Sequence, residues 1–270
     1  MTSPLGSLRI GIIGLGNMGG ALAAGLLRSG LAPTRLSGFD PSLAALDAFG
    51  GQAAAGVGPL AAESDVVVIA VKPHLVAGVA AEVGRAARPG TIVVSVAAGI
   101  ESRTIDAALS APLPLVRAMP NIAATVGASA TALHSERADG SQRATAQALF
   151  ETIGQVVWLP RESEMHVFTA LASSGPAFVC VFAEALADAA VREGMSRANA
   201  RAATAAMLEG AARMLRAHAG SPAELKDAVS SPGGTTIVGL CAMEAAGFRA
   251  ATMAGVEAAT SRSRRIAGEA

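Results

Sequence analysis

The amino-acid sequence predicts an α/β domain with a doubly wound parallel sheet, followed by an all-helical domain. Three observations carry this prediction. Short apolar runs alternate with helical patterns in the first half of the chain, and strand patterns stop in the second half. Runs such as DVVVIAV (65–71) are apolar without alternation, which is typical of strands buried on both faces of a parallel sheet. We therefore expect two domains, 1–160 and 161–270.

The elements follow from the same patterns in chain order. The expected strands cover residues 8–14, 35–40, 65–71, 91–97, 114–120 and 155–160. Between them, helices are expected to begin near Met18, Pro41, Pro59, Leu75 and Ser102, with a further helix over 139–154. In the second half, apolar residues at three- and four-residue spacing predict helices over 163–172, 176–193, 196–217, 222–229, 235–246 and 248–267.

Composition limits the classes of function. The chain has 270 residues, of which 51% are hydrophobic and 16% charged, so a sizeable folded core is expected. A formal net charge of +0, no tyrosine and one tryptophan give no reason to expect nucleic acid or an acidic membrane surface as partner. Cys180 and Cys241 match no metal or redox spacing; we interpret both as buried thiols in the reducing cytoplasm.

The apolar stretch 165–186 is long enough to raise the question of a membrane span. Ser173-Ser174-Gly175-Pro176 lies in its middle and predicts a helix break, so we expect a buried helix pair and no membrane partner. The helix from Pro176 to Val191 is apolar on most sides and must be covered. Either a partner subunit or the first domain of the same chain could cover it.

The stretch IGIIGLGNMGGAL (10–22) follows a strand and opens a helix, and it contains glycines at 14, 16 and 19. Such glycines allow a tight turn and let the backbone approach a pyrophosphate at a helix start, as in Rossmann-like domains. Asp40 ends the second strand about 20 positions on, where a carboxylate can accept the ribose hydroxyls of NAD. The alternatives are a tight turn without a ligand, and for Asp40 an N-cap of the helix at Pro41.

Other strand ends are candidates for the same site, because ligands of open α/β sheets bind beyond the carboxyl ends of the strands. Lys72 follows the third long strand, SVAAGI (95–100) ends the next, and Asn121 follows the strand after that. Lys72 could instead be an exposed loop lysine, SVAAGI simple loop packing, and Asn121 a turn cap. The predicted cofactor-binding residues are Gly14, Leu15, Gly16, Asn17, Met18, Gly19, Asp40, Ala70, Val71, Lys72, Pro73, Ala97, Ala98, Gly99 and Asn121.

Taken together, these segments resemble the pyrroline-5-carboxylate reductase family across essentially the whole chain. The resemblance is carried by the glycine loop, AVKPH, SVAAGI, VRAMPN, SSGPAF, EALADAAVREGM and, most specifically, DAVSSPGGTTIVGL (227–240) with EAAGFRAA. It implies a Rossmann domain and a helical dimerisation domain, assembled as a homodimer or a larger oligomer. The implied activity is reduction of the cyclic imine 1-pyrroline-5-carboxylate to L-proline with NADH or NADPH, the last step of proline biosynthesis.

The resemblance also implies a role for the segment 227–240. The substrate is a cyclic imino acid, and backbone N–H groups at a helix start can hold its carboxylate. The predicted substrate-binding residues are Ser231, Gly233, Gly234, Thr235 and Thr236. Thr236 is the candidate catalytic residue, as donor to or orienter of the imine nitrogen, with water as the alternative donor. The segment could also be an ordinary capped helix start.

Several positions depart from the family's pattern. Ile122-Ala123 and Ala172-Ser173 replace residues that commonly position substrate and nicotinamide, so a related cyclic imine is an alternative substrate. Val57 replaces an asparagine that often touches the cofactor. Asp40 replaces a small or hydroxyl residue and favours NADH over NADPH. The resemblance also places Glu162 near a ligand-contacting position.

Two rival classes share this layout. The β-hydroxyacid dehydrogenases use a helix lysine as acid or base, and the helix after SSGPA contains no lysine, which argues against hydroxyl oxidation. A non-catalytic dinucleotide-binding protein is the second rival, because a cofactor fold does not by itself prove chemistry. No metal site is expected, and His74, His134, His166 and His218 are interpreted as surface or core residues.

Overall fold

The computed structural model describes residues 5–268. By their contacts these residues form two compact units, one reaching to Ser173 and including the chain from Thr260 onward, the other spanning Ser174–Ala259. These contact-based units group helix α7 (Glu164–Phe168) with the first half of the chain. The domain boundary at residue 160 stays a prediction.

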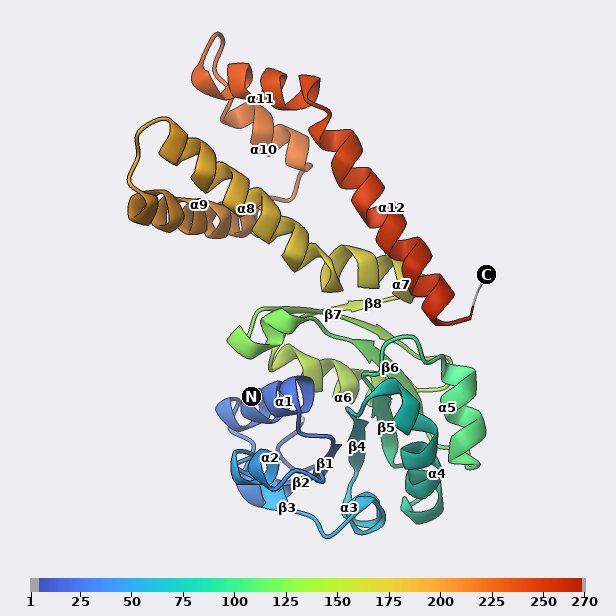
Figure 1. Cartoon of the computed structure of the whole chain (residues 1–270). Coiled ribbons are helices and arrows are strands. Elements are labelled where there is room, and N and C mark those ends of the chain that lie inside the picture. The colour runs from blue at the N-terminus through green and yellow to red at the C-terminus, as the bar shows by residue number, and fades with distance from the viewer. Residues whose placement is uncertain (1–4, 269–270) are drawn as a thin grey trace. The chain divides into compact units, whose positions relative to one another are not determined.

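The first unit is built on one sheet of strands in the order β3-β2-β1-β4-β5-β6-β7-β8 (Figure 1). The strands are β1 Ile10–Ile13, β2 Leu36–Phe39, β3 Gln52–Ala53, β4 Val66–Ile69, β5 Ile92–Ser95, β6 Leu115–Met119, β7 Ser129–His134 and β8 Gly154–Trp158. Neighbouring strands pair in parallel except β6 and β7, which are antiparallel. The predicted α/β class is confirmed. Strands β3 and β7 were not predicted. Strand β3 is only two residues long, and β7 is rich in small side chains.

Helices of the first unit lie close to their expected starts. They are α1 Asn17–Arg28, α2 Leu43–Asp47, α3 Val57–Glu63, α4 Val76–Ala86, α5 Ser102–Leu109, α6 Gly140–Glu151 and α7. Short 3₁₀ turns add η1 Pro33–Arg35, η2 Pro73–Leu75 and η3 Ile122–Val126, and η4 Thr169–Ser173 is a π-helical turn.

Alternate residues of the strands enter two different hydrophobic cores, one on each face of the sheet. Ile12 and Val68 pack into a core with Leu22 of α1 and side chains of α6. Ile13 and Ile69 enter the other core, which α3, α4 and α5 complete. Both faces are thus buried, and burying one such side chain contributes about 1.5–3 kcal/mol. The carboxyl ends of the central strands are therefore held by packing on both sides.

The second unit consists of helices in the described residues, as predicted. They are α8 Gly175–Arg192, α9 Arg197–Ala217, α10 Pro222–Ala228, α11 Thr235–Ala245 and most of α12 Phe248–Ile266. Helix α8 packs along α9 (Figure 1). The rings of Phe182 in α8 and Phe248 in α12 contact each other with centroids 5.5 Å apart. Ser221 and Glu224 form a capping box at the start of α10.

Many apolar side chains of the second unit are exposed in the single chain. Examples are Val179, Val181, Met207, Met214, Val238 and Met253. Cys180 and Cys241 are exposed as well, so the expectation of two buried thiols is wrong for the isolated chain. The reason is that the helices of this unit bury few of their own apolar faces. A helical unit that leaves many large apolar side chains exposed is typical of one that binds a partner.

The expected break at Ser173–Pro176 is present only as a bend at Ser174, between η4 and the start of α8 at Gly175. The π-helical turn η4 carries the helical conformation through to α8, and Pro176 lies in the first turn of α8, where its missing N–H costs no hydrogen bond. Taken together, Glu164–Arg192 is a helical stretch of 29 residues whose length and composition would suffice to cross a membrane. Within its apolar 18-residue segment, 11% is buried inside the protein. Core helices of soluble proteins meet the same criterion, so this is weak evidence for a span.

Candidate functional site

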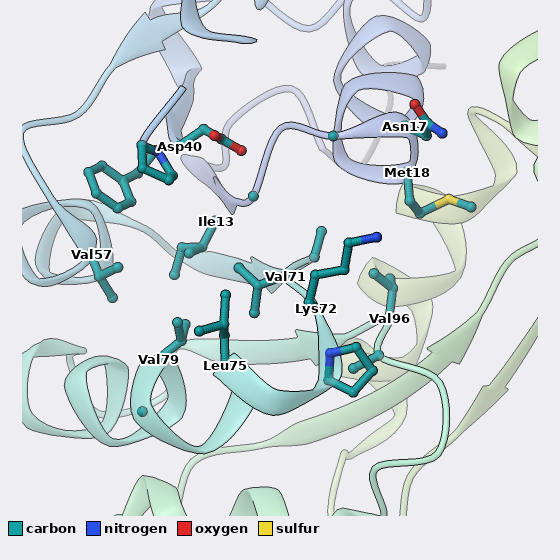
Figure 2. A pocket seen from close by; sticks show the side chains of 18 of the residues that line it. Ile13, Asn17, Met18, Asp40, Val57, Val71, Lys72, Leu75, Val79 and Val96 are labelled. Atoms are coloured by element: carbon teal, nitrogen blue, oxygen red, sulfur yellow. The ribbon is translucent and has the colours of Figure 1, made fainter. Parts of the chain in front are cut away.

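A cavity of about 860 Å³ lies at the carboxyl ends of β1, β2, β4 and β5 (Figure 2). The strand order reverses between β1 and β4, which is where open α/β sheets bind ligands. The predicted cofactor residues that line the cavity are Gly14, Gly16, Asn17, Met18, Asp40, Ala70, Val71, Lys72, Pro73, Ala97 and Ala98. The structure thus brings together residues from four separate predicted segments.

Two of the three glycines in the loop are required by packing, and the third borders open space. A Cβ at Gly14 would lie 2.6 Å from the Ala70 carbonyl oxygen, and the φ of Gly14 is +92°. A Cβ at Gly19 would lie 1.9 Å from the Gly14 carbonyl oxygen. At Gly16 no atom lies within 4 Å of the position of a Cβ. Gly16 leaves room for a ligand to approach the backbone at the start of α1, so the loop fits a pyrophosphate.

Asp40 supports the glycine loop from the end of β2. Its Oδ2 accepts a hydrogen bond from the backbone N–H of Leu15 at 2.7 Å, and its Oδ1 accepts one from the N–H of Ser42 at 2.8 Å. Helix α2 is capped by Ser42, whose Oγ accepts from Ala45 N–H, so Asp40 is not its N-cap. Each carboxylate oxygen accepts one of these two bonds and can accept another, which leaves capacity for a ribose hydroxyl.

Three of the residues that line the cavity are charged: Asp40, Lys72 and Glu82. In Figure 2, Asp40 and Lys72 approach the cavity from different sides, and the Lys72 side chain extends toward the region of Asn17 and Met18. Glu82 of α4 accepts a hydrogen bond from the backbone N–H of Gly58 at 3.0 Å. The lining therefore holds two carboxylates and one ammonium group.

Sequence reasoning missed several lining residues and included others that do not line the cavity. The missed ones are Ile13, Phe39, Pro41, Leu75, Gly78, Val79, Glu82 and Val96. Val57, which the family resemblance placed at a cofactor-contacting position, also lines the cavity. Ile13, Phe39 and Val96 could have been found as strand ends, and Leu75, Val79 and Glu82 as one helix face at three- and four-residue spacing. Leu15, Gly19, Gly99 and Asn121 do not line it.

Asn121 is used within the protein. It is 8% exposed, its Oδ1 accepts from the N–H of Ala123 at 3.2 Å, and its Nδ2 donates to the Ala172 carbonyl at 2.8 Å. It is the N-cap of η3, which matches the turn-cap alternative. Through Ala172 it also fastens η4 to the strand-end loop after β6.

A buried ion pair lies beside the cavity wall. Arg117 of β6 has a 6% exposed side chain, and its Nη1 lies 2.7 Å from Oε1 of Glu162. The same oxygen accepts from the backbone N–H of Ser102 at 2.7 Å and from its hydroxyl at 3.0 Å. Partial burial alone would raise the pKa of Glu162, but the hydrogen bonds and charge of Arg117 together with Ser102 lower it. Glu162 is therefore held as a carboxylate.

The turn 230–236 lies in the second unit, where it precedes α11. Gly233 has a φ of +67°, which favours glycine, and Gly234 is the N-cap of α11 without any side-chain cap bond. A Cβ at Gly234 would lie 2.3 Å from Ser231 Oγ, so the serine closes over the glycine. Thr235 and Thr236 form the exposed first turn of the helix. The helix start thus presents backbone N–H groups that no side chain caps.

Three of the four histidines make polar contacts within the protein. His134 Nδ1 lies 3.0 Å from the Leu159 carbonyl oxygen, His166 Nδ1 lies 3.0 Å from Ser263 Oγ, and His218 pairs with Glu224 at 3.0 Å. Among residues 5–268, no group of three histidine, cysteine, aspartate or glutamate side chains is arranged to hold a metal ion.

Comparisons with known proteins agree with this geometry. Residues 162–266 match the family described as pyrroline-5-carboxylate reductase dimerisation, and residues 9–99 match the family described as NADP oxidoreductase, coenzyme F420-dependent. A curated relative, pyrroline-5-carboxylate reductase 3 of Macaca fascicularis, is 38% identical over 268 residues, covering 96% of each chain.

Two solved structures are similar along nearly the whole length. A pyrroline-5-carboxylate reductase from Coxiella burnetii has a TM-score of 0.93 at 33% identity, covering 96% of this chain and 98% of that one. A pyrroline carboxylate reductase from Plasmodium falciparum with NADP bound has a TM-score of 0.85 at 27% identity, covering 97% and 99%.

Proposed function

This chain belongs to the pyrroline-5-carboxylate reductase family, and from that membership and the geometry of its sites we propose that it reduces 1-pyrroline-5-carboxylate to L-proline with a nicotinamide dinucleotide. It is an NAD(P)H-dependent oxidoreductase that acts on a C=N bond. The dinucleotide lies in the cavity at the carboxyl ends of β1, β2, β4 and β5. The imino acid is held by the turn 230–236.

The cavity fits a dinucleotide because each part of the cofactor has a matching group. The open space at Gly16 and the start of α1 receive the pyrophosphate, and Asp40 faces the adenosine ribose. We expect the adenosine half on the β2 side of β1 and the nicotinamide half on the β4–β5 side, near Ala97 and Ala98, because the strand order reverses between β1 and β4. When bound, the reduced nicotinamide supplies a hydride to the imine carbon.

The uncapped start of α11 is the single observation that carries the substrate assignment. The substrate carboxylate needs several hydrogen-bond donors, and the first N–H groups of a helix supply them together with the positive end of the helix dipole. Gly233 and Gly234 let the turn fold tightly, and no side chain makes a cap hydrogen bond to the start of α11. A carboxylate held there restricts the orientation of the imino acid, and a fixed orientation favours the reduction of its C=N bond.

Thr236 is proposed to hydrogen-bond the imine nitrogen, or to hold a water that does. The nitrogen must gain a proton as the carbon gains the hydride, and a hydroxyl can donate a hydrogen bond to it. Replacing Thr236 with alanine should lower turnover more than about tenfold, which is about 1.4 kcal/mol. Thr145→Ala, in the surface helix α6, removes a hydroxyl that bonds the Ser141 carbonyl and serves as the control. An unchanged rate in Thr236→Ala would remove this role.

We further propose that NADH is preferred over NADPH. Of the charged residues that line the cavity, Asp40 and Glu82 are negative and only Lys72 is positive. The 2′-phosphate of NADPH would approach Asp40, and like charges at short distance repel. A clearly higher kcat/KM with NADPH would contradict this preference.

The proposed activity is tested by following cofactor consumption spectrophotometrically with pyrroline-5-carboxylate and, separately, with a six-membered cyclic imino acid. We expect a higher kcat/KM with the five-membered ring. Turnover of the six-membered ring alone would assign a related imine. Binding of the dinucleotide without turnover of either ring would show the non-catalytic alternative.

A homo-oligomer is consistent with the exposed apolar faces of the second unit and with the dimerisation family that matches it. A second copy of the chain would cover the apolar faces of α8 that the single chain leaves open. The proposal that a dimer is the basic unit rests on the family resemblance. The proposal of a cytoplasmic location rests on the two free cysteines.

A further inference from the structure

The segment from Ala97 to Ser102 links the cavity to helix α5. It follows β5, and Ala97 and Ala98 line the cavity on the side assigned to the nicotinamide. Gly99 takes a φ of +72° and does not line the cavity. The segment then enters α5 at Ser102.

The ion pair between Arg117 and Glu162 fastens both ends of this segment. Nη2 of Arg117 donates to the carbonyl oxygen of Ala97 at 3.4 Å, at the start of the segment. Oε1 of Glu162 accepts from the N–H of Ser102 at 2.7 Å, at its end. Arg117 and Glu162 are joined at 2.7 Å, so one ion pair spans the two ends.

Burying the charged groups of Arg117 and Glu162 costs desolvation free energy, and a role beyond stability would explain why the pair is present. Arginine is rarely buried, yet Arg117 is 5% exposed on a central strand, where a hydrophobic side chain of similar volume would often serve stability as well. A fully apolar replacement could not bond Ala97 and Ser102 at once. The geometry therefore favours a role in shaping the segment rather than in strengthening the core alone.

We propose that Arg117 and Glu162 are positioning residues for the nicotinamide ring, acting through the segment Ala97–Ser102. The inference rests on the proposed function for the identity of the ligand. Neither side chain lines the cavity, so both act through the backbone they hold. The adenosine half of the site, formed by Asp40 and the glycine loop, has no bond to this pair and should not depend on it.

The test compares two ligands that differ only in the nicotinamide. Binding of NADH and of ADP-ribose to the purified full-length protein is measured by calorimetry, without imine. In Arg117→Met, we expect the Kd of NADH to rise at least about fivefold and the Kd of ADP-ribose to stay within about twofold. Should the protein bind NADPH more tightly, NADPH and 2′-phospho-ADP-ribose take their places.

Matched variants separate positioning from general destabilisation. Arg88→Met removes another ion pair, Arg88–Asp65 at 2.7 Å, at the opposite end of the strands, and should change neither Kd. Arg117→Lys keeps the charge but cannot reach both partners, so it should not restore NADH binding. Glu162→Gln is measured in the same way and decides the outcome if Arg117→Met does not fold.

The result that overturns the inference is an equal change in the two Kd values, or no change in either, in Arg117→Met and Glu162→Gln. A separation of the two Kd values together with no turnover of pyrroline-5-carboxylate would contradict the proposed function and leave this inference standing. Failure of the two proposals can therefore be told apart.

Discussion

Asp40 holds two backbone N–H groups and is proposed to bind the ribose of the cofactor, and replacing it should change both functions. Its carboxylate accepts the N–H of Leu15 at 2.7 Å and the N–H of Ser42 at 2.8 Å, and it faces the proposed ribose site. Asp40→Asn keeps the size of the side chain and removes its charge. It also leaves one oxygen to accept hydrogen bonds, so either the glycine loop or the Ser42 turn loses its acceptor.

The magnitude follows from the bonds at stake. A hydrogen bond to a charged group contributes about 1.5–3 kcal/mol, and 1.4 kcal/mol corresponds to a factor of ten. Losing one such bond at the glycine loop should therefore lower NADH kcat/KM by roughly 10- to 100-fold. NADPH suffers the same loss in the loop but gains from the removal of a negative charge near its 2′-phosphate. The ratio of NADPH to NADH kcat/KM should rise at least about tenfold.

The assay measures kcat/KM for both cofactors with pyrroline-5-carboxylate as the oxidant. Asp65→Asn is the matched control, because Asp65 also accepts a backbone N–H, that of Arg9 at 2.8 Å, but does not line the cavity. It should leave the cofactor ratio unchanged. The reasoning is refuted if Asp40→Asn leaves both kcat/KM values and their ratio as they are in the unmodified protein.

Three further predictions concern the loop, the ion pair and the helical unit. Gly19→Ala should lower Tm, because its Cβ would lie 1.9 Å from the Gly14 carbonyl oxygen. Gly16→Ala should keep Tm and weaken NADH binding, because its methyl group enters open space that the ligand needs. Equal Tm losses of the two variants in calorimetry would contradict this. The pKa of Glu162 is lowered in the folded state from 4.5, so its ionised form stabilises the fold above that pH and the contribution is lost as pH falls through the folded-state pKa. The Tm difference between the unmodified protein and Glu162→Gln should thus shrink in acid, and a difference that grows on acidification would be incompatible with it; Asp106, whose pKa is raised by burial, titrates in both proteins. Val181→Asp places a charge on a 67% exposed apolar position of α8 and should increase the monomer fraction in light scattering, while Leu43→Asp, at a 77% exposed position of the first unit, should not; an unchanged dimer in both would argue against an interface at Val181.

Sequence patterns predicted the fold well where one physical signal dominated. Continuous β-branched runs identify the central strands because burial on both faces leaves no room for polar residues. Strand β7 was missed because Ser129, Ala130 and Thr131 carry small side chains without that signal. The π-helical turn was missed because the sequence offers Pro176 and Gly175 as apparent helix breakers, and only the i→i+5 bonding shows how the helix continues.

The candidate site was predictable at strand ends and less so elsewhere. Gly14, Asp40, Lys72 and Ala97 could be placed from the rule that ligands bind beyond the carboxyl ends of strands. The two bonds that tie Asp40 to backbone N–H groups join residues 25 and 2 positions apart, and no pattern announces them. The ion pair between Arg117 and Glu162 joins residues that are 45 positions apart in the sequence. The chain between them includes β7, which runs antiparallel to β6 and was not predicted.

The most direct test of the central claim is the fate of the hydride. The protein is incubated with pyrroline-5-carboxylate and NADH in which both hydrogens at C4 of the nicotinamide are deuterium, and the product is analysed by mass spectrometry and NMR. We expect L-proline with one deuterium at C5, the former imine carbon. Proline without deuterium, or consumption of the cofactor without any proline, would contradict the account.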